Sequence, residues 1–200
     1  MIKIMNKNIQ KAINVIRESL NEKRLYLYNL NLTTEDLTYI LNIEKYQGYF
    51  ANLKMLTLSE NNLKNLPEDI FDKLVNLEWL CLSYNNLKNL PEKIFENLVN
   101  LKELSLDHNN LTNLPEKIFE NLVNLKALYL YNNELKNLPE NIFDNLINLK
   151  SLYLDNNKLT NLPENIFDKL VQLEWLDLRK NKLTSLPEKI KNKQGLTINI

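Results

Sequence analysis

From residue 53 onward, hydrophobic and polar positions recur every 24 residues. When the first leucine of a unit is counted as position 1, leucine returns at positions 4, 6, 11 and 14, asparagine at 9, proline at 15, glutamate at 16 and isoleucine at 18. Self-similarity at such a period is the signature of a solenoid, in which the units stack as successive coils. Six leucines open the units: Leu53, Leu77, Leu101, Leu125, Leu149 and Leu173.

Within a unit, the leucines at positions 4 and 6 alternate with variable or polar residues at 3, 5 and 7, which predicts a short strand buried on one face. Proline at 15 and glutamate at 16 suit the first turn of a short helical segment, where proline loses no hydrogen bond and the carboxylate meets the positive helix end. Apolar residues at 18, 19 and 22, such as Ile70, Phe71 and Leu74, should pack back onto the strands. The pattern predicts an α/β solenoid with a parallel sheet and short helical or irregular crossovers.

Asparagine at position 9 stands at the turn that leaves each predicted strand. Its amide offers both a carbonyl and an NH2 group, so it can satisfy backbone donors and acceptors that the turn leaves unpaired. We interpret these asparagines as structural rather than catalytic. They are Asn61, Asn85, Asn109, Asn133, Asn157 and Asn181.

The combined motif LxxLxLxxNxLxxLPxxIFxxLxx resembles the typical 24-residue class of leucine-rich repeats, as in Toll-like receptor ectodomains and variable lymphocyte receptors. The resemblance implies a curved solenoid whose sheet lines the concave face, where ligands commonly bind. Those secreted receptors usually carry cysteine-rich caps, and often glycine two residues after the proline. This chain has one cysteine, and at the glycine place stand Asp69, Lys93, Lys117, Asn141, Asn165 and Lys189.

Both ends of such an array need protection, because a stack of apolar coils exposes its core at the first and last members. We expect residues 1–52 to form an N-terminal helical cap and an irregular first repeat, 53–195 the six repeats, and 196–200 a terminal strand, all in one domain. The outer edge of that strand allows weak edge-to-edge self-association as the alternative to a monomer.

The cap is predicted from an apolar stripe at helical spacing, with a partner-docking or membrane-surface helix as the alternative. In the irregular coil that follows, Leu25 and Leu27 match positions 4 and 6, and Thr33 or Thr34 is the candidate cap of a second helix. The stripe consists of Met5, Ile9, Ala12, Ile13, Ile16 and Leu20.

Composition narrows the classes of function. Lys+Arg and Asp+Glu are equal at 25 each, so no overall field attracts nucleic acid or an anionic membrane, and neither is expected as a partner. With two glycines and one cysteine, the common phosphate-binding loops, an internal disulfide and a thiolate zinc cluster are excluded. No cofactor or metal is expected. Without a signal-like or membrane-length apolar run, the expectation is a cytoplasmic protein.

Positions 3, 5, 7 and 8 point away from the leucines and vary freely, so we expect them to form the binding face. Strands about 4.8 Å apart would place Tyr129 and Tyr153 side by side, with Tyr131 close by and Trp175 diagonal to them. Aromatic residues dominate binding hot spots, which favours a protein-protein interaction module. Glycan binding is the alternative, as is a structural array whose aromatic residues merely suit exposed strands. The predicted contact residues are Trp79, Tyr84, Glu103, Asp107, His108, Tyr129, Tyr131, Tyr153, Asp155, Trp175 and Asp177.

Charge and spacing refine this interpretation. At the four variable positions, two cationic residues stand against five carboxylates, so we expect a protein or peptide partner of somewhat basic character. His108 and Cys81 would lie roughly 11 Å apart by strand geometry, too far for a catalytic dyad. We therefore expect no catalytic residues and a non-enzymatic function.

Overall fold

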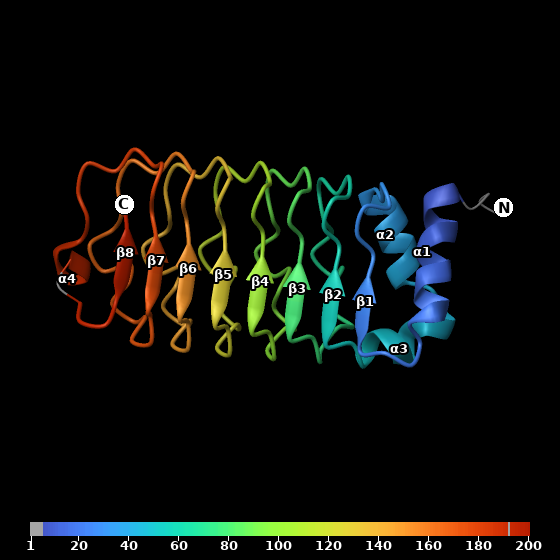
Figure 1. Cartoon of the computed structure of the whole chain (residues 1–200). Coiled ribbons are helices and arrows are strands. Elements are labelled where there is room, and N and C mark those ends of the chain that lie inside the picture. The colour runs from blue at the N-terminus through green and yellow to red at the C-terminus, as the bar shows by residue number, and fades with distance from the viewer. Residues whose placement is uncertain (1–5, 192) are drawn as a thin grey trace.

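The computed structural model describes residues 6–191 and 193–200, which wind into a solenoid with one strand per coil (Figure 1). The strands are β1 (Arg24–Tyr26), β2 (Met55–Thr57), β3 (Trp79–Cys81), β4 (Glu103–Ser105), β5 (Ala127–Tyr129), β6 (Ser151–Tyr153), β7 (Trp175–Asp177) and β8 (Thr197–Asn199). The helices are α1 (Lys7–Glu18), α2 (Thr34–Leu41), the 3-10 turn η1 (Glu44–Tyr46), α3 (Gln47–Ala51) and α4 (Glu188–Lys191). None of these helices is long and apolar enough to cross a membrane.

All eight strands form one parallel sheet in chain order, and the leucines of position 4 stay in register along it. This arrangement confirms the predicted α/β solenoid. Leu25 of β1 pairs with Leu56 of β2, so the first coil contributes a regular strand, although its crossover is long and helical. Leucines at positions 4 and 6, such as Leu104 and Leu106, are fully buried in the column between the sheet and the crossovers.

The opposite wall of the core is a column of stacked phenylalanines at position 19. Their ring centroids are 6.3–6.5 Å apart from coil to coil, whereas parallel strands lie only about 4.8 Å apart. The coils therefore spread on the phenylalanine side, and the array bends with its sheet on the inner, concave side. The column consists of Phe71, Phe95, Phe119, Phe143 and Phe167.

The crossovers of the regular coils are turns rather than short helices. The N–H group of Ile70 donates a hydrogen bond to the carbonyl of Pro67 at 3.3 Å, and later coils repeat this turn. A single hydrogen-bonded turn does not propagate, because fixing a helical nucleus is costly and the buried residues that follow bend the chain back to the sheet. Only α4, in the last coil, is helical.

The asparagines of position 9 link each coil to its neighbours. Asn109 Nδ2 donates to the carbonyls of Leu82 and Leu106 at 3.0 and 3.1 Å, and its Oδ1 accepts from the N–H of Leu87 at 3.1 Å. The same contacts recur from Asn61 to Asn181. Each amide thus joins the turn of its own coil to the preceding coil.

The N-terminal cap is a pair of helices against β1 (Figure 1). Thr33 caps α2 in a capping box with Asp36, and Asn6, the N-cap of α1, donates to the Asp36 carboxylate at 2.6 Å. Ile13 and its neighbours on the stripe are buried, but Leu20 is exposed, so its predicted place on the stripe is wrong. The helix ends at Glu18, and Leu20 lies in the following turn. Met5 lies outside the described residues.

Candidate functional site

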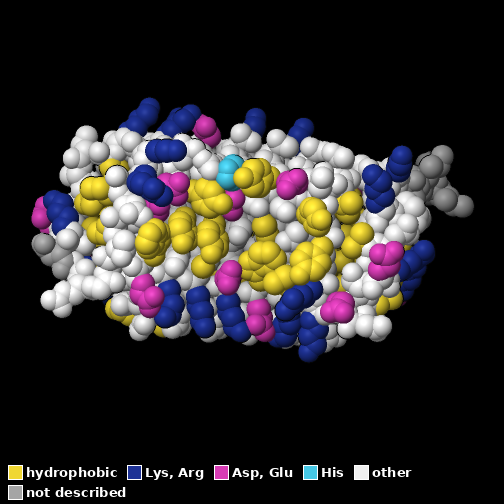
Figure 2. All heavy atoms as spheres, in the orientation of Figure 1, with side chains coloured by type: hydrophobic (Ala, Val, Ile, Leu, Met, Phe, Trp, Pro, Cys, Tyr) yellow, Lys and Arg dark blue, Asp and Glu magenta, His cyan; other side chains and the backbone are white. Residues whose placement is uncertain are grey.

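The concave face is the solvent-facing surface of β1 to β8, built from positions 3, 5, 7 and 8 of each coil. Figure 2 shows a band of hydrophobic side chains along this face, with charged side chains on both of its edges. In-register pairing places Ser105 beside Tyr129, Tyr129 beside Tyr153, and Tyr153 beside Asp177. Side chains at one position of successive coils therefore form a row along the solenoid.

Five aromatic side chains on this face contact one another, and we call them the ring cluster. Tyr84 stacks on His108 at 3.9 Å between centroids, and His108 meets Tyr131 edge to face at 5.2 Å. Tyr131 then meets Tyr153 at 6.5 Å, and Tyr153 stacks on Tyr129 at 4.9 Å. The cluster runs continuously from the β3 coil to the β6 coil, and its Tyr129–Tyr153 stack agrees with the expected strand spacing.

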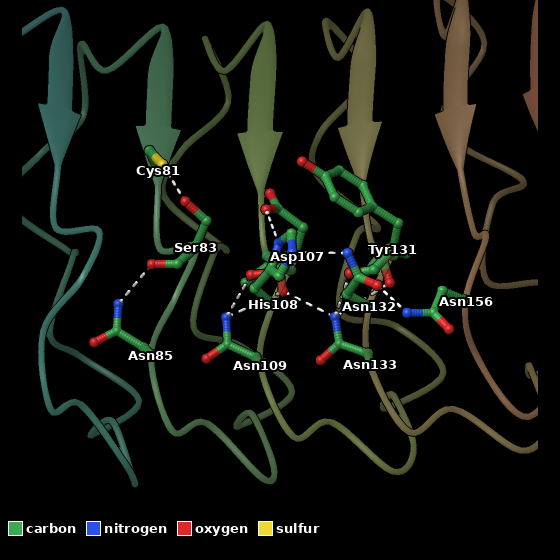
Figure 3. Close-up of polar contacts among 12 residues, drawn as sticks. Cys81, Ser83, Asn85, Asp107, His108, Asn109, Tyr131, Asn132, Asn133 and Asn156 are labelled. Atoms are coloured by element: carbon green, nitrogen blue, oxygen red, sulfur yellow. Dashed lines mark hydrogen bonds and ion pairs between the residues drawn. The ribbon is translucent and has the colours of Figure 1, made fainter.

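A polar network holds His108 in place (Figure 3). Its Nε2 lies 2.8 Å from Asn132 Nδ2, which can only donate, so Nε2 accepts and the ring proton stands on Nδ1. Nδ1 in turn donates to Asp107 Oδ2 at 2.9 Å. Asn132 Oδ1 in turn accepts from Asn156 Nδ2. The orientation of the central ring is therefore fixed from three coils.

Position 8 has a left-handed backbone in every regular coil, with φ between 50° and 55°. Asparagine tolerates this conformation best among residues with a side chain, and Asn132 and Asn156 follow the rule. Histidine is enriched there as well, so His108 at φ 50° also fits, whereas Tyr84 at φ 53° does not, at a cost of about 1–2 kcal/mol. Glu60 and Lys180 share this conformation, so the left-handed turn belongs to the repeat, and the side chain on it can vary from coil to coil.

The acidic residues of the concave face divide into two groups. Asp107 and Asp177 are only 4% and 2% exposed, although both were expected to offer their carboxylates to a partner. Burial alone would raise the pKa of Asp177, but hydrogen bonds from Arg179, at 2.6 Å for Nη2 to Oδ2, lower it below the ordinary value. Short side chains at positions 5 and 7 are shielded by their neighbours one strand away, which the sequence pattern does not reveal.

The other carboxylates remain accessible. Glu103 is exposed, and Asp155 is partly buried, with its pKa raised by burial and by the charge of Asp177. Burial also raises the pKa of Tyr129 and of Tyr131, and nearby carboxylates add to the effect for both. The tyrosines therefore stay neutral near pH 7, and each hydroxyl keeps its proton as a hydrogen-bond donor.

The two tryptophans stand apart from the ring cluster. Trp79 and Trp175 are partly buried at position 3, and among the described residues no ring contact joins either to the tyrosines. Trp175 pairs with Ser151 on one side and Thr197 on the other, and its indole N–H is buried without a hydrogen-bond partner in the described chain. Trp175 is diagonal to Tyr153 in the strand register, as expected, but within the described residues its ring does not contact the tyrosine pair.

Two further tyrosines belong to the concave face and were missed in the sequence. Tyr26 and Tyr28 occupy positions 5 and 7 of the β1 coil, and both are exposed. The Tyr26 hydroxyl donates to Met55 Sδ at 3.5 Å. Because Leu25 and Leu27 match positions 4 and 6, the residues that follow them could have been assigned to this face from the sequence.

The geometry offers no support for a catalytic pair. Cys81 Sγ shares a hydrogen bond with Ser83 Oγ at 3.0 Å, while both ring nitrogens of His108 are bound to Asp107 and Asn132. Within the described ranges, no group of three or more His, Cys, Asp or Glu side chains is arranged to hold a metal ion.

Comparison with known protein families shows which family the chain belongs to. The leucine-rich-repeat family matches four overlapping segments, residues 26–87, 51–111, 99–159 and 147–192. The chain belongs to the leucine-rich-repeat family. In this leucine-rich-repeat protein the match begins at residue 26, inside β1, so it includes the first coil. Leucine-rich repeats are generally protein-interaction modules. No curated protein matches the chain as a relative.

Proposed function

We propose that this leucine-rich-repeat protein binds another protein or a peptide through its concave face and catalyses no reaction there. The observation that carries the proposal is the ring cluster, which joins five aromatic side chains across four coils. Tyrosine gives large contact area at small entropic cost, and a sheet fixed by hydrogen bonds on both sides presents it without reorganisation.

Packing needs alone do not account for the cluster. Tyr84 is 52% exposed and occupies a left-handed position where asparagine would be less strained. Stacking on His108 contributes roughly 0.5–1.5 kcal/mol, about the size of that strain, so the pair gives the fold little net stability. A role in binding explains why an exposed aromatic side chain occupies this position.

Charge around the cluster favours a partner with basic side chains. Glu103 and Asp155 are the accessible carboxylates beside the tyrosines, whereas the cations of this face lie in coils outside the ring cluster, Arg24 in β1 and Arg179 and Lys180 in the β7 coil. A nucleic acid would need several phosphate contacts in a row, and this face lacks a cationic row beside its rings. A lysine or arginine placed at the edges of the tyrosine rings would meet hydroxyl oxygens and carboxylates together.

Glycan binding is less well supported than protein binding. A sugar stacks on the free face of an aromatic ring, but Tyr129 and Tyr153 stack on each other at 4.9 Å with a 10° angle between planes. Tyr84 and His108 cover each other in the same way. Ring edges and hydroxyls are what the cluster mainly offers, and these suit the mixed surface of a protein.

The test uses a ring variant that carries Tyr84→Ala, Tyr131→Ala and Tyr153→Ala. Tyr39→Ala is the matched control, because Tyr39 is 40% exposed but lies on α2, away from the concave face. Proteins that the wild type captures from a lysate of the source cells are identified and purified. Circular dichroism first shows that the wild type, the ring variant and the Tyr39→Ala control are all folded. Each purified partner is then titrated against these three proteins.

The expected result is a loss of affinity for the ring variant of more than about 100-fold, since central aromatic side chains each contribute about 2 kcal/mol or more. The Tyr39→Ala protein should bind like the wild type. Equal affinity of the ring variant and the wild type would contradict the proposal, as would binding of a purified glycan by the wild type but of no protein.

A further inference from the structure

A chain of hydrogen bonds crosses the concave face from the β6 coil to the β4 coil (Figure 3). Asn156 Nδ2 donates to Asn132 Oδ1. Asn132 Nδ2 lies 2.8 Å from His108 Nε2, and His108 Nδ1 lies 2.9 Å from Asp107 Oδ2. We call this chain the amide relay, and its members are Asp107, His108, Asn132 and Asn156.

All three hydrogen bonds of the amide relay point in the same direction. An amide nitrogen can only donate, so both asparagines donate towards the imidazole, and the imidazole N–H donates to the Asp107 carboxylate. Hydrogen bonds aligned in this way polarise and strengthen one another. The carbonyl oxygen of the Asn156 side chain accepts no hydrogen bond within the described residues, so it is the free end of the relay.

The two ends of the relay lie in different surroundings. Asp107 is only 4% exposed, whereas Asn156 is an exposed residue. With strands about 4.8 Å apart, Asn156 lies two coils and roughly 10 Å away from His108. A change of proton at the buried end can therefore alter a group that faces solvent and a partner.

Protonation of His108 reverses the relay. Histidine is the side chain that changes charge most readily between about pH 5 and pH 8. The imidazolium carries an N–H at both nitrogens, so Nε2 can no longer accept from Asn132. A half-turn of the Asn132 amide presents Oδ1 to Nε2 and Nδ2 to Asn156, whose amide must then turn as well. The terminal torsion of asparagine is broad and roughly two-fold, so neither half-turn requires the backbone to move.

The groups that face His108 can accommodate a positive charge. From the β3 coil Tyr84 stacks on the ring at 3.9 Å, and the face of a tyrosine attracts a cation. From the β5 coil Tyr131 meets the ring at 5.2 Å and stays neutral, because burial raises its pKa. On its own coil the Asp107 carboxylate attracts the imidazolium. Other titratable groups of this face form no hydrogen bond, ion pair or ring contact with His108 within the described residues, among them Glu60, Glu103, Tyr129, Tyr153, Asp155 and Lys180.

We propose that His108 sets the direction of the amide relay and thereby determines, with pH, what the concave face offers to a partner. With a neutral imidazole the relay ends in the Asn156 carbonyl oxygen, an acceptor that suits the basic partner proposed above. With an imidazolium it ends in an NH2 donor, and a positive charge stands inside the ring cluster. The reversal itself needs no partner, but its effect on affinity rests on the proposed function.

Nuclear magnetic resonance of the whole chain, labelled with nitrogen-15, tests the relay without any partner. At about pH 7.5 the imidazole proton should stand on Nδ1, with Nε2 unprotonated. On acidification to about pH 5, Nε2 should gain a proton, and the side-chain NH2 signals of Asn132 and Asn156 should shift with the same midpoint as the imidazole signals. A proton on Nε2 instead of Nδ1 at the higher pH overturns the proposal. So does an Asn156 signal that does not follow His108.

Two variants that suit the left-handed backbone of position 8 separate the relay from simple electrostatics. Asn132→Gly removes the middle amide, and glycine adopts φ 52° without strain. In this variant His108 should still titrate, whereas the Asn156 signal should no longer follow it. His108→Asn removes the titrating ring, so the signals of Asn132 and Asn156 should stay constant with pH. An Asn156 signal that shifts in both variants as strongly as in the wild type reports the neighbouring Asp155 carboxylate and overturns the relay.

Binding of the purified partner protein measures the consequence for recognition. The affinity of the wild type should fall more than about tenfold between about pH 7.5 and pH 5.5, because cationic side chains of the partner lose an acceptor and meet an imidazolium. In His108→Asn the same pH change should alter affinity by about twofold or less, whatever the affinity of this variant at the higher pH. An equally steep pH dependence in His108→Asn would show that another group titrates, such as Asp155, and would overturn the role of the relay in recognition.

The amide relay and the concave binding site fail in distinguishable ways. If the ring variant binds the captured proteins like the wild type, the proposed site is wrong, although the coupled titration of His108 and Asn156 still supports the relay. If the ring variant loses binding while the Asn156 signal does not follow His108, the site stands and the relay is wrong.

Discussion

After its strand, each regular coil has two adjacent residues that differ in how far the fold restricts their side chains. Position 9 is an asparagine whose amide satisfies backbone groups of two coils, so its side chain is dictated by the fold. Position 8 has a left-handed backbone that tolerates glutamate, tyrosine, histidine, asparagine and lysine in different coils. The asparagine at position 9 is required by the architecture. The residue at position 8 differs from coil to coil and changes the concave face, at some cost in backbone strain.

Asn109→Ala should lower the free energy of unfolding by about 1–3 kcal/mol, because buried carbonyls and an N–H group lose their partner. Asn181→Ala should cost less, since Asn181 makes the same contacts in the last regular coil but is only partly buried, and water can replace it. Urea denaturation of both variants measures the difference. Equal losses would show that burial of the amide does not set its contribution.

Glu78 provides a pH-dependent prediction. Hydrogen bonds from Lys102 and then Lys54 lower the pKa of its carboxyl from 4.5 to about 2. The folded value lies below the unfolded one, so this contribution to stability is present above pH 4.5 and is lost as the pH falls towards 2. A carboxyl carbon-13 titration should give a midpoint near 2, and Lys102→Met should raise it. A wild-type midpoint near the ordinary value would contradict both ion pairs.

At the scale of the element, one coil is a strand, a turn held by asparagine and a crossover anchored by phenylalanine. No coil buries its own apolar face, because Leu and Phe side chains fill the gap between neighbouring coils rather than within one. Phe119, for example, stacks on Phe95 at 6.5 Å and on Phe143 at 6.4 Å. Stability therefore belongs to the interfaces between coils.

Phe119→Ala should destabilise the protein by about 3–5 kcal/mol, because it removes a fully buried ring from the middle of the column. Val123→Ser, four residues later but at a side chain that is 41% exposed, should change stability by about 0.5 kcal/mol or less. Thermal and urea unfolding of the two variants make the comparison. A large loss in Val123→Ser would show that Val123 contributes to the core despite its exposure.

At the scale of the whole molecule, the solenoid is protected at the N-terminal end by α1 and α2 and is less well covered at the other end. Ile9, Ala12, Ile13 and Ile16 close the first coil, whereas Leu183 and Leu186 in the last coils are only partly buried. In a linear array each coil is stabilised mainly by its neighbours, so a damaged end should open locally.

Ile13→Asp places a carboxylate in the buried contact of α1 with the first coil. Amide hydrogen exchange should accelerate in β1 and β2 and remain near wild-type rates in β6 and β7, because the defect decays over neighbouring coils. Exchange that accelerates equally along all strands would show that the array unfolds as one unit instead. Lys11→Asp, on the exposed side of α1, is the matched control.

Much of this architecture could be predicted from the sequence, because the repeat of 24 residues fixes which side chains face the core. The Tyr129–Tyr153 stack followed from strand spacing alone. The burial of Asp107 and Asp177 did not, since it depends on which neighbour shields a short side chain. The prediction that Leu20 lies on the buried stripe of the helix was wrong, because periodicity does not reveal where a helix ends. Tyr26 was not assigned to the concave face, because the first repeat was treated as irregular.

The strict register of the coils also has a consequence for how the gene of such a protein can change. Removal of residues 126–149 would join Leu125 to Lys150, which are positions 1 and 2 of a unit, and every core and asparagine contact would find an equivalent partner. The concave face, however, would lose Tyr129 and Tyr131 and bring Asp107 beside Asp155. Gain or loss of a whole unit thus preserves the fold while it changes, in a single step, which side chains the concave face offers to a partner.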